Sequence, residues 1–454
     1  MIFYNNGRHC LWVSSNLIEG IAESRGEYKF TTNRTIILII VRSTVKLSTR
    51  EAQMRRLYDT VVRAHFEHYE EMLFLSGPRQ VGKTTTSKSL SELGPYYYFN
   101  WDDEDHRAIL LEGPAKVIET AGIQQLTQVK PIIAFDEIHK RPDWKNFLKG
   151  FYDTYKESVN IIVTGSARLD IYKKGGDSFL GRYFPYRMHP VSVAEIARTH
   201  MRPMEIAMPY DIGETQFSQL LKFGGYPKPY LQHNETFSNR WQQLRKQQLL
   251  QEDIRDVNVI HDLHRLELLM EILQRRASHP LTYSNLAKQI RVSVDTIIRW
   301  LEVLQSFYYC YLIRPWSRNI ARALVKEPKV FLWDWSVIRD PGARTENFIA
   351  SHLLKAVQYW TDAGMGEYGL YYIRDLDKHE VDFVVTKNDE PWFLVEAKHG
   401  ENQSLNLNLA RFQQSTKASH AFQVAMNDEF INKNCFTYHQ PIIVPAKTLL
   451  SQLI

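Results

Sequence analysis

A glycine-rich segment near residue 80 has the residue types and the spacing that hold a phosphate chain. Residues 75–84 read LSGPRQVGKT and satisfy the pattern G-x-x-x-x-G-K-[ST]. In such a loop the glycines let backbone N–H groups turn toward phosphate oxygens, the lysine amine reaches the β- and γ-phosphates, and the threonine hydroxyl binds Mg²⁺. A surface glycine turn is the alternative, but a strand is predicted before this segment and a helix after it, as a phosphate loop requires. We therefore predict that ATP and Mg²⁺ bind to Gly77, Pro78, Arg79, Gln80, Val81, Gly82, Lys83, Thr84 and Thr85.

Within this loop, two side chains have separate expected roles. Lys83 is expected to act on the transferred phosphate as a catalytic group, and Thr84 to be a direct metal ligand.

Two adjacent acids follow a later apolar run. Residues 132–137 read IIAFDE, so Asp136 and Glu137 end a predicted buried strand. We expect Asp136 to hold Mg²⁺ through water and Glu137 to orient or deprotonate the attacking water. Two acids after an apolar run are otherwise more often a helix cap or a turn, so this assignment depends on its pairing with the phosphate loop. Residues 161–166 read IIVTGS, and we expect the hydroxyl of Thr164 to lie near the γ-phosphate.

An arginine that completes the charge of the transition state is also expected. Arg182 is the residue that we assign to this role, and Arg168 is the alternative. Either side chain could act within its own chain or on a neighbouring copy.

A second group of candidate metal ligands lies near the C-terminus. Glu346 falls on a predicted helix, Asp382 in the strand predicted at 381–385, and Glu396 on the next strand. Lys398 follows two residues later and therefore lies on the same face of the sheet. This is the layout of a PD-(D/E)xK nuclease, in which Asp382, Glu396 and Glu346 would bind Mg²⁺ and Lys398 would be catalytic. A nuclease-like fold that only binds its partner is the alternative.

The elements that must position these groups alternate between strand and helix over residues 54–200. Such alternation predicts a mostly parallel sheet that is covered on both faces, the α/β architecture of a P-loop NTPase. The strands are expected at residues 72–75, 96–100, 132–135, 160–164 and about 184–189.

Four other segments complete the predicted organisation. Residues 1–53 show no sustained period and are expected to be an N-terminal extension. Residues 201–260 are rich in Gln and Leu and predict a helical lid, which a glycine turn at 224–227 interrupts. Residues 261–327 predict a winged helix, and residues 328–454 predict a C-terminal α/β domain with the nuclease-like layout.

The winged-helix segment is a candidate for contact with DNA. Residues 262–329 contain 11 Lys and Arg against 6 Asp and Glu. Its second helix could present four polar side chains to a DNA groove, although such a unit can equally be a packing or oligomer contact. These side chains are Ser293, Asp295, Thr296 and Arg299.

The composition sets broader limits. The 454 residues are 44% hydrophobic and 24% charged, which is typical of a globular protein with several structural units. The run 35–41 is much shorter than a bilayer-spanning helix, so no membrane segment is expected. Three widely separated cysteines exclude a disulfide framework, which favours a reducing cytoplasm. The composition does not determine the oligomeric state.

With these motifs in this order, the chain resembles the prokaryotic AAA-type ATP-binding proteins that join a P-loop ATPase domain to a C-terminal domain of unknown function. The resemblance runs from about residue 54 to the end, so residues 1–53 would be an upstream extension or the product of a misplaced start. It departs from the family at Trp333-Asp334-Trp335, where a smaller residue usually follows the aspartate. It is carried by GPRQVGKTT from Gly77, FDEIH from Phe135, TGS from Thr164, Gly181-Arg182, GGYP from Gly224, EVDFV from Glu380 and VEAK from Val395.

The resemblance implies ATP binding and a nuclease-like C-terminal fold, and it leaves the substrate open. We expect an ATPase that hydrolyses ATP with Mg²⁺ to control a DNA-binding, nuclease-like C-terminal region. The alternative is a signalling or scaffold ATPase with protein partners and a catalytically silent nuclease-like fold. A third interpretation, binding of ATP without hydrolysis, would require Glu137 to be misplaced.

Overall fold

The computed structural model divides the chain into two compact units, Met1–Met54 and Arg55–Ile454. In the first unit, β1 (Gly20–Ser24), β2 (Glu27–Thr32) and β3 (Thr35–Ile39) form an antiparallel sheet in the order β1-β2-β3. The structure describes residues 20–24, 27–32, 35–39, 54–123, 129–165, 179, 181–198, 204–255, 260, 262–317, 327–400 and 404–454.

The second unit begins with a five-stranded sheet in the order β5-β6-β7-β4-β8. All of its described pairings are parallel, and apolar residues bury the inner strands on both faces. The predicted mostly parallel sheet is therefore confirmed. Its strands are β4 (Met72–Ser76), β5 (Tyr96–Asn100), β6 (Ile132–Asp136), β7 (Asn160–Gly165) and β8 (Tyr183–Arg187).

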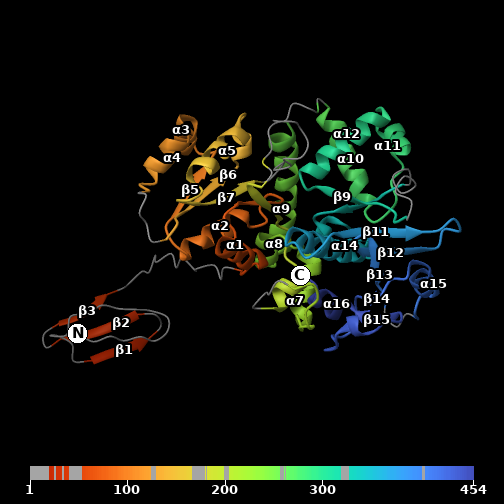
Figure 1. Ribbon diagram of the computed structural model, residues 1–454. Helices are drawn as coiled ribbons and strands as arrows, with labels where there is room; N and C mark the ends of the chain where they lie inside the picture. The colour runs from red at the N-terminus through yellow and green to blue at the C-terminus, as the bar shows by residue number, and fades with distance from the viewer. Residues whose placement is uncertain are drawn as a thin grey trace. The chain divides into compact units, whose positions relative to one another are not determined.

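Helices cover both faces of this sheet (Figure 1). On one face, Phe147 and Phe151 of α5 (Trp144–Tyr155) pack against Phe135 of β6. On the other face, α2 (Lys83–Ser89) contacts β7. The remaining elements are α1 (Leu57–His68), η1 (Leu90–Glu92), α3 (Glu104–Glu112), α4 (Pro114–Thr120), η2 (Ile138–Lys140) and α6 (Val193–Ala197).

The next segment is helical. Its elements are joined by a turn at Gly224 and Gly225, where side chains would not fit. Gly224 has a φ of 82°, and a Cβ at Gly225 would lie 2.6 Å from the ring of Trp335. The large tryptophan after Asp334 thus packs against a glycine. The helices are α7 (Glu214–Phe223), α8 (Pro227–Gln232), α9 (Glu235–Gln248) and the π-helix η3 (Leu249–Ile254).

Three helices and a two-stranded antiparallel sheet follow. The strand β9 (Cys310–Ile313) pairs with β10 (Lys329–Leu332). The sequence-based boundary between residues 327 and 328 therefore separates two paired strands, because cross-strand pairing is not visible in either segment alone. The helices are α10 (Leu263–Arg275), α11 (Tyr283–Ile290) and α12 (Val294–Ser306).

The C-terminal part contains a mixed five-stranded sheet in the order β11-β12-β13-β14-β15 and the long, largely buried helix α14 (Pro341–Asp362). Among the described helices, none is both long and apolar enough to span a membrane. The strands are β11 (Tyr368–Arg374), β12 (Glu380–Lys387), β13 (Glu390–Lys398), β14 (His420–Ala425) and β15 (Ile442–Pro445). The helical elements are η5 (Trp335–Val337), α15 (Leu407–Thr416), η6 (Cys435–Thr437) and α16 (Ala446–Gln452).

Candidate functional site

The phosphate loop lies at the carboxyl end of β4, directly before α2. Gly82 is the N-cap of α2 and has a φ of 112°, a conformation that glycine adopts without strain. A Cβ at Gly77 would overlap the carbonyl oxygen of Met188, which follows β8. Both glycines are therefore required by the backbone path, and they let the loop curl around the start of a helix.

Lys83 is held inside this loop. Its amine donates hydrogen bonds of 2.8 Å to the carbonyl oxygens of Gly77 and Pro78. Burial lowers the pKa of Lys83 to about 8, although Glu137 and Asp136 oppose the shift. The ammonium is thus poorly solvated and is paired with neutral carbonyl groups rather than with a carboxylate.

Asp136 is surrounded by hydroxyl groups from three different elements. One carboxylate oxygen accepts from Thr84 at 2.9 Å and from Tyr98 at 2.6 Å, and the other accepts from Thr164 at 2.6 Å. Thr164 lies opposite Asp136 in the β6–β7 register. The structure therefore brings together Thr84, Asp136 and Thr164, which the sequence assigned to one site.

Tyr98 is a member of this group that the sequence did not indicate. It lies in β5, the edge strand beside β6, and burial raises its pKa well above the ordinary value, with a further contribution from its hydrogen bond to Asp136. The phenol therefore stays protonated and donates a hydrogen bond to Asp136. The clue in the sequence was a run of three tyrosines in one strand, but only the strand order shows which of them meets Asp136.

Glu137 follows Asp136 in an unusual backbone conformation. Its φ of 54° and ψ of 20° are left-handed, and its N–H donates to the carbonyl oxygen of Thr164 at 2.9 Å. Strained positions of this kind are concentrated at active sites. The carboxylate lies 3.6 Å from Nε2 of His139 and 3.8 Å from the amine of Lys140, which also pairs with Asp102.

His139 contributes no strong positive charge to this cluster. Burial lowers the pKa of its imidazole, and its Nδ1 is a buried atom without a hydrogen-bond partner among the described residues. Lys140 is therefore a cation close to the carboxylate of Glu137, in addition to Lys83, whose pKa the charge of Glu137 raises.

The helical segment contacts the outer part of the phosphate loop. Nε1 of Trp241 donates to Oε1 of Gln80 at 2.5 Å, and Arg79 pairs with Asp253 at 2.5 Å and with Glu252 at 3.4 Å. Burial raises the pKa of Asp253 to about 6. The sequence placed Arg79 and Gln80 in the site but did not identify these partners. A small cavity at the contact is lined by Arg79, Gln80, Arg245, Gln248, Leu249, Asp253 and Phe307.

Arg182 is not brought to the phosphate loop of its own chain. It immediately precedes β8, and its carbonyl oxygen accepts from the N–H of Met72 at the first residue of β4. The phosphate loop follows the last residue of β4 and therefore lies at the opposite end of that strand. The side chain instead pairs with Asp153 at 2.8 Å. The structure therefore does not bring Arg182 to the phosphate loop of its own chain, its role as the arginine finger stays a prediction, and Arg168 lies outside the described residues.

The C-terminal acids surround an internal lysine. The amine of Lys329 lies 2.9 Å from Glu346, 2.5 Å from Glu380 and 3.4 Å from Asp382, and Lys329 is only 3% exposed. The ammonium thus occupies the space between Glu346 and Asp382, which the sequence assigned to Mg²⁺. The sequence did not single out Lys329, which appears there as one lysine at the start of an apolar strand.

Glu396 and Lys398 form a separate pair at the end of β13. Oε1 of Glu396 accepts from Lys398 at 2.8 Å and from Asn406 at 2.9 Å, whereas its buried Oε2 has no hydrogen-bond partner in the part of the chain that the structure describes. Asp382 accepts from the N–H of Ala397 at 2.9 Å. These contacts place Asp382 and Glu396 at neighbouring positions of β12 and β13.

The carboxylates of this region destabilise one another's charged forms. Burial raises the pKa of Glu346 to about 8 and also raises that of Glu396, and Asp382 adds to both shifts. Yet Glu346, Asp382 and Glu396 do not form a set of three ligands within 4.8 Å of one another in the described chain. In the described structure these carboxylates pair with two lysines, Lys329 and Lys398, and the three-ligand metal site stays a prediction.

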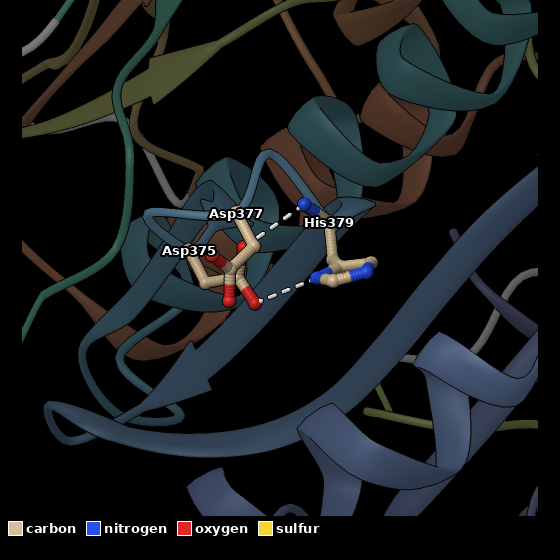
Figure 2. Close-up of side chains that lie close together, drawn as sticks. All are labelled: Asp375, Asp377 and His379. Atoms are coloured by element: carbon tan, nitrogen blue, oxygen red, sulfur yellow. Dashed lines mark hydrogen bonds and ion pairs between the residues drawn. The ribbon is translucent and has the colours of Figure 1, made fainter.

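The described residues contain one group with such ligand spacing, and it lies elsewhere. Asp375, Asp377 and His379 occupy the turn between β11 and β12, with ligand atoms within 4.8 Å of one another (Figure 2). The N–H and Nδ1 of His379 lie 2.9 Å and 3.1 Å from the carboxylate of Asp375. Arg411 also pairs with Asp375 at 3.1 Å, so the carboxylate of Asp375 already has a cationic partner.

Two of the four predicted DNA-contacting residues, Ser293 and Thr296, have a structural role at the start of α12. Oγ of Ser293 accepts from the N–H of Thr296 at 3.1 Å and also contacts its hydroxyl, so these side chains cap the helix. Asp295, Arg299 and Glu302 are exposed on the outer face and together carry little net charge.

The basic excess of residues 262–329 is also not a surface patch of the described chain. Of the 11 basic residues, three fall in the range 318–326 outside the described residues, and Lys329 is buried among carboxylates. The seven that remain nearly balance the six acidic residues of the segment.

Comparisons with known proteins agree with the geometry of the first site. Residues 69–197 match the model of a family described as an AAA domain. Residues 214–340 and 341–443 match two further models, each described as a domain of unknown function.

The curated relatives and the solved structures that match this chain have low sequence identity to it. The chain is 22% identical over 341 residues to the uncharacterized proteins Rv2008c of Mycobacterium tuberculosis and Mb2031c of Mycobacterium bovis, covering 72% of this chain and 70% of each relative. Among solved structures, the Walker-type ATPase PABY2304 of Pyrococcus abyssi is 14% identical, with a TM-score of 0.37 over 64% of this chain and 95% of that chain. PCH-2 of C. elegans is 15% identical, with a TM-score of 0.23 over 38% of this chain and 44% of that chain.

The fold assignment rests on the AAA-domain match and on the site itself. The parallel sheet, the glycine loop between β4 and α2, and the acid at the end of β6 occur within or beside the matched range. Residues 69–197 therefore match the AAA-domain model and have the parallel α/β sheet and phosphate loop that are typical of a P-loop NTPase.

Proposed function

We propose that this chain hydrolyses ATP with Mg²⁺ at the loop 77–84. The observation that carries the proposal is the arrangement around Asp136, whose carboxylate accepts from three hydroxyls and, among the described residues, forms no ion pair. Hydroxyl and carboxylate oxygens are the ligands that Mg²⁺ prefers, so Thr84 and Asp136 fit that ion. When bound, Mg²⁺ would neutralise charge on the phosphate oxygens.

The chain's own groups would carry out the remaining steps. Lys83 would exchange its two carbonyl partners for β- and γ-phosphate oxygens, which are stronger acceptors for a buried ammonium. Glu137 would orient the attacking water and accept its proton. Its backbone is left-handed directly after β6, and its carboxylate lies 3.8 Å from the amine of Lys140.

Phosphate release tests this assignment. Glu137→Gln should lower turnover at saturating ATP by about 10²- to 10⁴-fold, because a general base is removed while the shape of the side chain is kept. Binding of a fluorescent ATP analogue should be retained. Lys83→Ala, purified in parallel, is the control for contaminating ATPases. Equal turnover in wild type and Glu137→Gln would exclude the proposed base.

A second candidate function is metal-dependent cleavage of nucleic acid by the C-terminal region under the control of the ATPase domain. It is favoured by the buried Oε2 of Glu396, which has no hydrogen-bond partner among the described residues. Burial, with the charge of Asp382, raises the pKa of Glu396, and a cation at this position would stabilise the ionised form. The position of Lys329 supports the alternative, a nuclease-like fold that is catalytically silent and binds a protein partner, because its ammonium already forms ion pairs with Glu346 and Asp382.

Plasmid nicking with Mg²⁺ distinguishes these outcomes. If the region cleaves DNA, Asp382→Asn should abolish nicking, whereas Asp377→Asn in the neighbouring turn should not. Nicking that persists in Asp382→Asn would indicate a contaminant, and no nicking by wild type would support the silent fold.

DNA binding through residues 262–317 is a separate proposal. Fluorescence anisotropy with duplex DNA at two salt concentrations tests it, because phosphate contacts make binding weaken steeply as salt rises. Binding without such salt dependence, or no binding, would favour a protein partner or a contact between copies of the chain.

A further inference from the structure

One face of α14 contacts the segment that follows β8. His352, Lys355, Gln358 and Asp362 recur every three or four residues and therefore lie on one side of the helix. Each of them bonds to a residue between Arg187 and Glu195. Asp362 accepts from Nη2 of Arg187 at 2.5 Å, Gln358 lies 2.7 Å from Nε2 of His189, and His352 accepts from the N–H of Val193 at 3.0 Å.

The fourth contact belongs to a fully buried charge cluster. Lys355 pairs with Glu195, and it also donates at 3.1 Å to the carbonyl oxygen of Pro190 and to Oγ of Ser192. The other carboxylate oxygen of Glu195 accepts from Nε of Arg56 at 3.0 Å. Lys355 is 1% exposed and Arg56 is 6% exposed. Removing one member of such a cluster leaves an uncompensated charge in the interior.

Arg56 extends this cluster to the phosphate loop. Its Nη1 donates to the carbonyl oxygen of Val81 at 2.5 Å, and its Nη2 donates to that of His189 at 2.6 Å. The buried side chains include two cations and only one carboxylate, so these carbonyl oxygens supply the rest of the charge compensation. The conformation of the loop around Val81 is thus part of what stabilises Arg56.

The pKa shifts agree with this arrangement. Burial alone would raise the pKa of Glu195, but Arg56 and Lys355 hold it at about 2. Burial lowers the pKa of Lys355 to about 8, with Glu195 opposing the shift. Glu195 therefore depends on Arg56 and Lys355 to remain ionised, and the charge of Glu195 in turn favours the protonated form of Lys355.

The backbone between β8 and Glu195 also supports the loop directly. The carbonyl oxygen of Met188 occupies the space that a side chain at Gly77 would need, and the methyl group of Met188 lies 3.2 Å from a Cβ built on Gly82. The phosphate loop therefore packs against the same segment, residues 188–195, that α14 contacts.

We propose that Lys355 is a positioning residue for the phosphate loop, acting through Glu195 and Arg56, so that the placement of α14 sets the affinity for ATP. This inference rests on the proposed function for its ligand and adds a route of regulation. A partner that shifts α14 would change ATP affinity, and by reciprocity ATP would change the affinity for that partner. Such coupling needs a continuous physical connection, and three side chains provide it here.

Hydrogen–deuterium exchange of the nucleotide-free protein tests the connection without requiring ATPase activity. Lys355→Met should raise the exchange rate of the amides in residues 77–84 by at least about fivefold and should weaken binding of an ATP analogue by a similar factor. The matched control is Asp362→Asn, which removes an ion pair between the same two segments but has no bond to Arg56 or Val81. It should leave both measurements within about twofold of wild type.

A second variant guards against misfolding of Lys355→Met. Arg56→Lys keeps the charge but cannot contact Glu195, Val81 and His189 together, so it should also speed exchange in residues 77–84. The proposal is overturned if Lys355→Met or Arg56→Lys, shown to be folded by its melting curve, leaves loop exchange unchanged. It is also overturned if Asp362→Asn changes loop exchange as much as Lys355→Met does. If wild type bound no ATP, the proposed function would fail, and the exchange result would still decide the role of Lys355.

Discussion

The ATP site and the C-terminal acid cluster both combine a buried lysine with carboxylates, but the two lysines have different partners. In the ATP site, Lys83 donates to two carbonyl oxygens and Asp136 accepts from three hydroxyls. In the C-terminal cluster, Lys329 pairs directly with three carboxylates. Hydroxyl donors orient a carboxylate without cancelling its charge, whereas an ammonium cancels it. The first site therefore retains an attraction for a metal ion that the second has partly satisfied internally.

The pKa shifts of the two lysines show the same difference. Burial lowers the pKa of Lys83 to about 8. Burial also acts to lower the pKa of Lys329, but Glu346, Asp382 and Glu380 outweigh it, and the pKa lies above the ordinary value. The ammonium of Lys83 is thus hydrogen-bonded to neutral carbonyl groups, whereas that of Lys329 is paired with three carboxylates.

Exchanging an equivalent acid in each region should give the largest difference. Asp136→Asn should reduce ATP turnover by at least about 10²-fold, because it weakens the binding of an ion that contributes several kcal/mol to the transition state. Asp382→Asn should leave turnover unchanged. Steady-state phosphate release with titrated Mg²⁺ measures both, and a similar loss in the two variants would show that the regions are not functionally distinct.

Removing each lysine should affect stability in only one region. Lys329→Met should lower the free energy of unfolding by about 3–5 kcal/mol, because three carboxylates lose their buried cation. Lys83→Met should cost far less, since only neutral carbonyl groups lose a donor. Urea unfolding followed by circular dichroism compares the two, and equal losses would contradict the idea that Lys329 replaces an external cation.

The pH dependence of stability should reveal the crowding of the C-terminal acids. Burial, with Asp382, raises the pKa of Glu346 from 4.5 to about 8. Because the folded state holds this proton more tightly, the associated stability is fully present below about pH 4.5 and is lost as the pH rises toward 8. In wild type the slope from this group is about 1.4 kcal/mol per pH unit.

The variant Glu346→Gln isolates this slope. Relative to wild type it should become progressively more stable between about pH 5 and pH 8, as measured by urea midpoints. Parallel curves for the two proteins would mean that Lys329 keeps Glu346 ionised throughout the range.

Arg182→Ala should give the smallest effect. Its pair with Asp153 is partly exposed and contributes well under about 1 kcal/mol. At saturating ATP, turnover should change by less than about twofold, because Arg182 and the phosphate loop lie at opposite ends of the strands of the sheet. A much larger loss, dependent on protein concentration, would instead show that Arg182 acts on a neighbouring copy.

The ATP site was largely predictable from the sequence because its motif is local. The loop around Lys83 and the acid after β6 each depend on a few consecutive residues, and the parallel sheet follows from strand–helix alternation. Tyr98 could not be predicted, because its contact with Asp136 depends on β5 being the neighbour of β6. That order is a property of the whole sheet.

The C-terminal cluster was predictable only in part for the same reason. The positions of Asp382 and Glu396 on adjacent strands follow from local alternation. The placement of Lys329 does not, since its partners Glu346 and Asp382 lie 17 and 53 residues away. At Ser293 the structure adds a local role, because its side chain caps α12, whereas the predicted DNA contact stays a prediction.

The buried contact between Glu195 and Lys355 has a consequence for how this chain can be divided. The AAA-domain match ends at residue 197, and the match to the C-terminal model begins at residue 341. A fragment cut at these limits would lack both Arg56 and Lys355 and would leave the carboxylate of Glu195 without a cation. Neither matched range therefore contains the complete charge cluster, and a fragment cut at these limits should be less stable than the same residues in the whole chain.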